Sequence, residues 1–142
     1  MDNNLCADFS NLVASAKKSV TQLLEEASQT DSPNLFPEQT LQSLKDSNFL
    51  TACIPSYFGG RDLGLKPGSN LALLKILKII GSGNLVLGRV LEGHFNAQLL
   101  INQFGTPKQI ENFSEDAFEG RLFGVWNTQA NDGVFLTSEK DN

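Results

Sequence analysis

Cysteine, histidine and basic residues are scarce in this chain, and each shortage argues against a class of protein. The two cysteines, Cys6 and Cys53, stand far apart without a C-x-x-C partner, which rules out a disulfide framework. With a single histidine, no Cys/His cluster for zinc or another metal is expected. Lys and Arg total 11 against 16 acidic residues, a net charge of −5, whereas a nucleic-acid binder needs a basic face.

Long apolar runs and enzyme signature motifs are also missing. No stretch reaches the roughly 18 apolar residues that cross a bilayer. The N-terminus, MDNNLCADFSN, is acidic and polar, unlike a secretory signal or an Arg-rich transit peptide. There is no G-x-G-x-x-G, P-loop, H-E-x-x-H or G-x-S-x-G motif. We therefore predict a soluble cytoplasmic protein that binds neither membranes nor nucleic acid.

Helical periodicity dominates the first 120 of the 142 residues. Apolar residues at steps of three and four predict helices over about 5–28, 37–46, 69–80, 84–104 and 106–119, with an ordered loop at 55–68. We expect the last helix to bury Ile110, Phe113, Ala117 and Phe118. Gly88 and Gly93 each cost about 1 kcal/mol relative to Ala inside a helix, which suggests close approach of a neighbouring helix or a bound molecule.

The pattern changes after Gly120. Residues 122–128 and 134–137 are aromatic and β-branched, so they predict two strands, which are marginal in water by themselves. The first 110 residues are neutral as a block, and the whole acidic excess lies in residues 111–142. We therefore expect a helical domain over 1–120 and, over 121–142, the beginning of a truncated β domain. The alternative is that the strands cap the helical bundle.

Three features are candidates for chemistry, and each also has a purely structural interpretation. His94 is either a core or pocket-wall residue or an acid/base, but no partner for the second role is visible. Glu92, the one carboxylate of an apolar helix, either faces solvent or marks an apolar cavity. The run Trp126-Asn-Thr-Gln129 either has a structural role or offers a flat face and polar groups for a flavin ring.

Several short motifs follow one another in a characteristic order. They are I-P-S-Y-F-G-G at 54–60, His94 on an apolar helix, F-G-T-P-K-Q at 104–109, F-E-G at 118–120 and N-T-Q at 127–129. In this order they resemble the N-terminal part of the acyl-CoA dehydrogenase family, over about residues 44–133. The resemblance implies a mainly α fold, a helical N-terminal domain followed by the first strands of a β domain. It also implies FAD as cofactor, acyl-CoA or a related small molecule as substrate, and a homo-oligomer at full length.

The resemblance assigns site residues by position. Those expected to border the flavin are Trp126, Asn127, Thr128 and Gly133. Those expected on the helix that lines the acyl pocket are Glu92, Gly93 and Asn96. No catalytic residue is assigned, because the family's base belongs to a C-terminal bundle that this chain does not contain. We therefore expect an N-terminal fragment that does not complete α,β-dehydrogenation of an acyl thioester alone.

Two other functions fit the same sequence. Gln129-Ala130 stands where Glu-Pro is usual in the family, which leaves room for a flavin monooxygenase of the same fold. A helical interaction module without cofactor would instead bind a partner through residues 84–104 and the acidic C-terminal region. Flavin binding separates the two enzymes from the module.

Overall fold

The computed structural model describes residues 3–30 and 35–125, and all of its regular structure is helical. The α-helices are α1 (Asn3–Lys18), α2 (Val20–Thr30), α3 (Glu38–Asp46), α4 (Ser69–Gly83), α5 (Leu85–Phe104) and α6 (Pro107–Phe118), with a short 3-10 helix η1 (Ser56–Phe58). The predicted mainly α fold is confirmed. None of the described helices is long and apolar enough to cross a membrane.

The strand predicted over 122–128 is wrong for the part that the structure describes. Residues 121–125 follow α6 without regular structure, and no described segment pairs with them as a strand. The N–H of Phe123, which a strand partner would need, donates instead to the side chain of His94 at 3.1 Å. The rest of this strand and the strand predicted at 134–137 lie outside the described residues.

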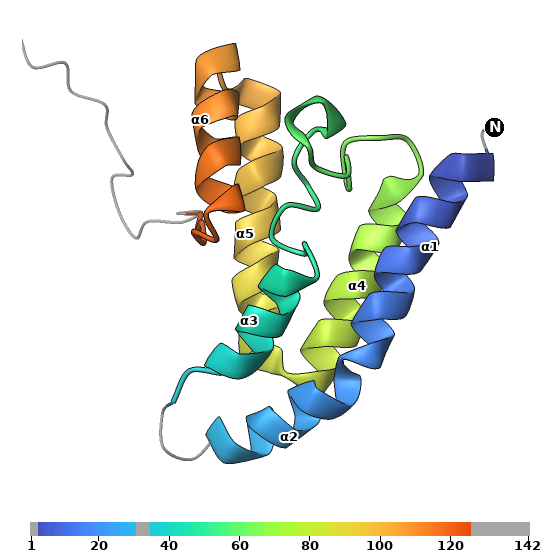
Figure 1. The fold of residues 1–142 in the computed structure, drawn as a ribbon, viewed down its shortest axis with the longest axis vertical. Coiled ribbons are helices and arrows are strands. Elements are labelled where there is room, and N and C mark those ends of the chain that lie inside the picture. Colours follow the sequence, from blue (N-terminus) through green and yellow to red (C-terminus); the bar gives the residue numbers. More distant parts are fainter. Residues whose placement is uncertain (1–2, 31–34, 126–142) are drawn as a thin grey trace, which may run out of the picture.

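The helix predicted as continuous over 5–28 is interrupted at Ser19, which separates α1 from α2. The Ser19 N–H is shared between the carbonyls of Ser15 at 3.3 Å and Ala16 at 3.2 Å, and its hydroxyl also donates to the Ser15 carbonyl. Serine hydroxyls compete for helix carbonyls in this way and bend helices. Because of this bend, α1 runs beside α4, while α2 turns beneath the C-terminal end of α4 (Figure 1).

The helices α4 and α5 form the centre of the fold and cross at a pair of glycines. A Cβ added to Gly88 would lie only 2.6 Å from the Cα of Gly81, so the two backbones are in direct contact. A Cβ at Gly83 would lie 2.7 Å from the Cβ of Leu23 on α2. The helix predicted to end at about residue 80 therefore continues to Gly83, and Gly81 and Gly83 are packing positions within it.

Away from this crossing, the segment 47–68 occupies the space between α4 and α5 (Figure 1). Gly64 lies between the two helices, since a Cβ there would meet Leu99 of α5 at 2.9 Å and Leu73 of α4 at 3.3 Å. The segment also supplies much of the core. Its fully or almost fully buried apolar residues are Phe49, Leu50, Ala52, Cys53, Ile54 and Leu63.

The helix α3 has no capping side chain of its own at its N-terminus. Glu26 of α2 provides the missing acceptors: its carboxylate oxygens accept from the N–H groups of Gln39 at 3.0 Å and Thr40 at 2.8 Å. A carboxylate at a helix N-terminus is also favoured by the helix dipole. This contact joins α2 to α3.

The helix α6 starts as predicted, but its buried face is narrower than expected. Thr106 and Gln109 form a capping box: the Thr106 N–H donates to Gln109 Oε1 at 2.8 Å, and Thr106 Oγ1 accepts from the Gln109 N–H. Ala117 is buried, whereas Phe113 and Phe118 are 38% and 49% exposed, so the burial predicted for both phenylalanines is wrong. The reason is that α6 packs mainly against α5 alone, at the edge of the bundle.

Candidate functional site

The helix α5 carries all the candidate site residues that the structure describes, and it has two contrasting faces. It starts at Asn84, whose side-chain oxygen accepts from the Leu87 N–H at 3.1 Å. Its inner face is buried and consists of Leu87, Gly88, Leu91, His94, Phe95, Ala97 and Gln98. Part of its exposed or half-buried surface, here called the outer stripe, consists of Leu85, Arg89, Glu92, Gly93, Asn96 and Leu100.

His94 lies on the inner face and is completely buried. Its Nε2 lies 2.8 Å from the Leu50 carbonyl oxygen, and its Nδ1 lies 3.1 Å from the backbone N of Phe123. Because the Phe123 N–H is a donor, Nδ1 must be the acceptor and Nε2 carries the proton. The structure thus supports the core interpretation of His94, and both ring nitrogens are occupied by backbone groups.

Gln98 completes this buried polar cluster. Its Nε2 donates to the Leu50 carbonyl at 2.6 Å, so this one oxygen accepts from both Gln98 and His94. The two side-chain nitrogens are 3.0 Å apart, but both are donors, so they do not hydrogen-bond to each other. Burial lowers the pKa of His94, and its bond to the Leu50 carbonyl opposes this only in part. The imidazole is therefore neutral at pH 7.

Glu92 lies on the outer stripe and is held by both of its oxygens. Oε2 accepts from Arg89 at 2.6 Å, and Oε1 accepts from the side-chain amide of Asn96. These residues are one helical turn apart on either side of Glu92, which places them on one face. A carboxylate with both oxygens engaged is a fixed polar group of the surface rather than a free base.

Gly93 is the one position of the outer stripe without a side chain. A Cβ added there would meet no atom of the described chain within 4 Å. The expected close approach of a neighbouring helix is therefore confirmed at Gly88 and not found at Gly93. Glu92, Gly93 and Asn96 do lie together on one side of α5, around a surface that the described residues leave open.

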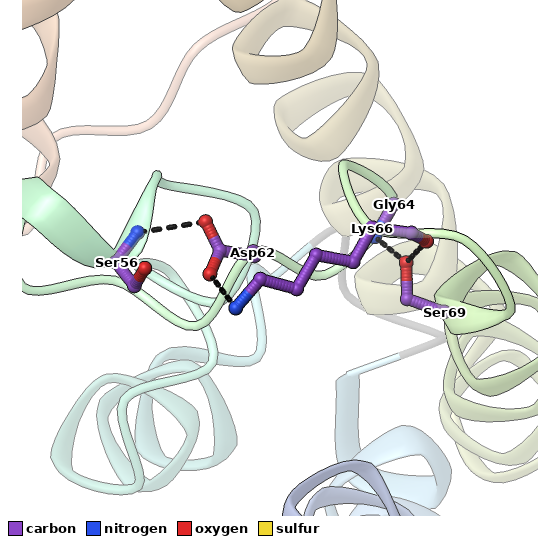
Figure 2. Close-up of polar contacts among 5 residues, drawn as sticks. All are labelled: Ser56, Asp62, Gly64, Lys66 and Ser69. Atoms are coloured by element: carbon purple, nitrogen blue, oxygen red, sulfur yellow. Dashed lines mark hydrogen bonds and ion pairs between the residues drawn. The ribbon is translucent and has the colours of Figure 1, made fainter. Parts of the chain in front are cut away.

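The loop before α4 contains a second polar cluster, which the sequence reasoning did not single out (Figure 2). The buried carboxylate of Asp62 accepts from the Ser56 N–H at 2.8 Å and pairs with the Lys66 ammonium at 2.5 Å. Burial alone raises the pKa of Asp62, but the contacts with Lys66 and Ser56 outweigh it and hold the pKa below its usual value. Asp62 has a positive φ of 55°, which aspartate tolerates better than most residues.

Ser69 closes the same loop at the start of α4. Its hydroxyl accepts from the Gly64 N–H at 2.8 Å and donates to the Lys66 carbonyl at 2.6 Å (Figure 2). These contacts hold the loop that lies between α4 and α5. The signal in the sequence was the turn composition of residues 55–68, which predicted an ordered loop but none of its hydrogen-bond partners.

Other chemistry is not supported by the described residues. Cys53 is buried without a disulfide, and burial raises the pKa of its thiol, so it is not a reactive thiolate. Within 9–30 and 35–125, whose side chains the structure describes, no three His, Cys, Asp or Glu side chains gather as a metal site. The residues predicted to border a flavin, Trp126, Asn127, Thr128 and Gly133, lie outside the described residues.

Comparison with known proteins gives one finding. Residues 8–121 match the family model described as acyl-CoA dehydrogenase, N-terminal domain, which covers most of the chain and all of the helices α2 to α6. Neither a curated protein nor a solved structure matches the chain. The match includes the polar clusters of His94 and Asp62 as well as the outer stripe of α5. The chain therefore belongs to the acyl-CoA dehydrogenase family, of which it contains the N-terminal helical domain.

Proposed function

We propose that this chain is the N-terminal domain of a flavin-dependent oxidoreductase that introduces an α,β double bond into an acyl thioester. Membership in a family that depends on FAD supports this proposal. When bound, FAD would accept the hydride from the β carbon. We propose further that residues 121–142 begin the flavin-binding β domain, that Trp126, Asn127, Thr128 and Gly133 border the flavin, and that the full-length protein is a homo-oligomer.

The observation that carries the proposal for substrate binding is the open surface at Gly93. The outer stripe contains the exposed side chains of Leu85 and Leu100, 78% and 45% exposed, on either side of this glycine. An acyl chain needs an apolar surface with free space, and Gly93 leaves that space free. We propose that this side of α5 borders the acyl chain.

The polar residues of the stripe then act as a border. Arg89 and Asn96 hold the Glu92 carboxylate in place by hydrogen bonds to its two oxygens. A charged group next to apolar surface disfavours the apolar end of a ligand, because burying that charge would cost several kcal/mol. Glu92 and Asn96 would therefore limit where the acyl chain lies, without taking part in proton transfer.

The chemistry needs groups beyond those described in this chain. The α proton must go to a base within hydrogen-bond reach. His94 is neutral but has both nitrogens bonded to backbone groups, and Glu92 has both oxygens engaged. We therefore expect that the purified 142-residue chain, given FAD and octanoyl-CoA, does not reduce an electron-accepting dye above background.

The test is to express the reading frame that contains this chain up to its first stop codon and to examine the product. A flavin absorption spectrum that bleaches anaerobically on addition of octanoyl-CoA would support the proposal. Bleaching that requires another reductant, followed by oxygen-dependent oxidation of a substrate, would indicate a monooxygenase of the same fold. A product without flavin would overturn both enzymatic functions and favour the helical interaction module.

A substitution at Gly93 tests the acyl surface in the same product. Gly93→Leu fills the open space on α5, so activity should shift toward shorter acyl chains. The matched control is Lys78→Leu, which adds the same apolar side chain at an exposed position of α4. If both variants keep the chain-length profile of the unmodified protein, Gly93 does not border the acyl chain.

A further inference from the structure

The side chain of His94 connects the core to the segment that leaves α6. Through Nδ1 it accepts from the Phe123 N–H, and its ring lies against the Phe123 ring with centroids 5.2 Å apart. The Phe123 ring in turn meets Phe113 of α6 edge-on, with centroids 5.7 Å apart. Residues 121–125 have no regular structure of their own. Phe123 is thus held to α5 by the hydrogen bond from its backbone N–H to His94 and by a ring contact with His94, and to α6 by a ring contact with Phe113.

The hydrogen bond between His94 and Phe123 exists for only one protonation state. A protonated imidazole carries a hydrogen on both nitrogens. The Leu50 carbonyl can accept the Nε2 hydrogen in either state, because it already does so. A hydrogen on Nδ1, however, would point at the Phe123 N–H, so two donors would face each other. Protonation therefore breaks the contact with Phe123 and keeps the contact with Leu50.

We propose that the His94–Phe123 contact is a pH-sensitive switch: neutral His94 holds residues 121–125 against α5 and α6, and protonated His94 releases them. The inference goes beyond the proposed enzymatic function and does not depend on it. It rests on the position of a buried imidazole between a carbonyl that always accepts and an N–H that always donates.

The charged groups of the neighbouring elements do not control the contact between His94 and Phe123. On α5 itself, Arg89 and Glu92 lie on the outer stripe and pair with each other. In the segment 47–68, which contains Leu50, the thiol of Cys53 stays neutral because burial raises its pKa, and Asp62 pairs with Lys66. The other ionisable side chains of this segment, Tyr57 and Arg61, are exposed or half-buried, and Lys75 and Lys78 of α4 are exposed. The charged residues of α6 and the segment that follows it are exposed or half-buried and include Lys108, Glu111, Glu115, Asp116, Glu119 and Arg121.

Those charges of α6 are also satisfied locally. Lys108 pairs with Glu111 at 2.8 Å, and Arg121 pairs with Asp116 at 2.6 Å and with Glu119 at 2.7 Å. The pKa of His94 is set by burial, which lowers it, and by the Leu50 carbonyl, which raises it, and the first effect is the larger. Release should therefore follow the protonation of His94 itself.

The expected size of the effect follows from linkage. Burial lowers the pKa of His94 in the closed state, and release removes the Phe123 N–H from Nδ1, so the pKa of His94 should be higher in the released state. Between these two values, the equilibrium constant for release rises about tenfold for each pH unit of acidification. Above pH 6.5 the closed state should not depend on pH through this group.

The experiment uses NMR on the 142-residue chain, from about pH 7.5 to about pH 5, across the titration range of histidine. Because His94 is the only histidine, one set of imidazole signals reports its state without assignment. Nitrogen shifts at the upper pH should show the neutral form with hydrogen on Nε2. Hydrogen exchange of the Phe123 amide, corrected for its intrinsic rate, should lose protection about tenfold per pH unit below pH 6.5.

Two variants and one internal reference separate release from other causes. His94→Leu removes both ring nitrogens, while Gln98 still donates to the Leu50 carbonyl, so the Phe123 amide loses its acceptor and should exchange rapidly at every pH. Gln98→Met removes the other donor to the same carbonyl and should keep the pH dependence. The Leu91 amide on the buried face of α5 is the internal reference.

The outcomes are distinct. Loss of protection at Phe123 below pH 6.5, with Leu91 still protected, supports the switch. Equal loss at Phe123 and Leu91 means that acid unfolds the whole domain, which overturns it. A pH-independent Phe123 amide, or neutral His94 with its hydrogen on Nδ1, overturns it as well.

Discussion

Gly88 and Gly93 belong to the same helix and face opposite environments. A Cβ at Gly88 would lie 2.6 Å from the Cα of Gly81, whereas a Cβ at Gly93 would meet nothing within 4 Å. Both residues carry the same cost in helix propensity. At Gly88 that cost is offset by the contact of two helices, and at Gly93 the described chain offers no offset. The inner face of α5 therefore packs against the rest of the fold, while the described residues leave its outer stripe open at Gly93.

The largest effect is expected for Gly88→Ala. The added methyl group would meet backbone atoms of Gly81, at 2.6 Å and 3.1 Å, and a backbone cannot move aside as a side chain can. The helices α4 and α5 would have to separate, and such overpacking costs about 3 kcal/mol. Equilibrium urea unfolding, followed by circular dichroism at 222 nm (a helix signal), would measure the loss.

A Gly88→Ala variant as stable as the unmodified chain would contradict the difference in packing between Gly88 and Gly93. It would mean that α4 and α5 do not touch at Gly81 and that both glycines of α5 are equivalent. Gly93→Ala, on the same helix, is the matched control for the change in propensity.

The sequence predicted these helices well because their signals are local. Thr106 and Gln109 lie three residues apart and form their capping box within α6. The ends of α3 and α5 follow from turn formers that directly adjoin them. The bend at Ser19 was missed because a helical serine gives a weak signal, and its consequence depends on where α4 lies.

The second-largest effect is a loss of stability in acid, which we expect from His94 on the inner face of α5. The folded-state pKa of His94 is lowered, so the unfolded chain binds more protons below pH 6.5. The free energy of unfolding should therefore be fully present above pH 6.5 and fall on acidification, by at most about 1.4 kcal/mol per pH unit, until the lower pKa is passed. Urea unfolding at a series of pH values measures this slope.

The variant His94→Leu should be less stable at pH 7, because the Phe123 N–H loses its acceptor. Between pH 6.5 and pH 5, its stability should also change less with pH than that of the unmodified chain. An equal slope in both proteins would show that a group other than His94 is responsible.

The third effect, about 1 kcal/mol, is expected for Asp62→Asn in the loop between α4 and α5. Asparagine tolerates the positive φ and can still accept from the Ser56 N–H, but it loses the charge that pairs with Lys66. Because Lys66 is 42% exposed, solvent screens the pair and keeps the loss small. Thermal unfolding at pH 7 would detect it.

The contribution of Asp62 to stability depends on pH. Burial alone would raise the pKa of Asp62, but its contacts with Lys66 and Ser56 lower it. The pKa of Asp62 is lowered, so its stabilisation is present above the ordinary value of 3.8 and lost as pH falls through the folded-state pKa. Asp62→Ala should cost more than Asp62→Asn, because it also removes the acceptor for Ser56. Equal losses in the two variants would show that the Ser56 contact contributes nothing.

The candidate site was predicted only in part, for a physical reason. Glu92 and Asn96 are one turn apart, so helical periodicity alone places them on one side. The partners of His94 are Leu50 and Phe123, 44 and 29 residues away in sequence, and no local pattern reveals them. The family resemblance therefore supplied Glu92, Gly93 and Asn96, and helical spacing places them on one side of α5, while the polar cluster of the inner face required the tertiary structure.

The smallest change in the free energy of unfolding is expected for Gly93→Ala, which tests directly whether Gly93 and Gly88 differ in their surroundings. With open space around the new methyl group, only helix propensity changes, so the chain should gain up to about 1 kcal/mol in the free energy of unfolding. Urea unfolding beside Gly88→Ala would then give opposite signs for the same substitution on one helix. A loss of stability at Gly93 would mean that some group already covers this surface in solution. A gain would mean that alanine at position 93 stabilises the chain without disturbing the fold. That result is expected where a glycine serves binding rather than packing.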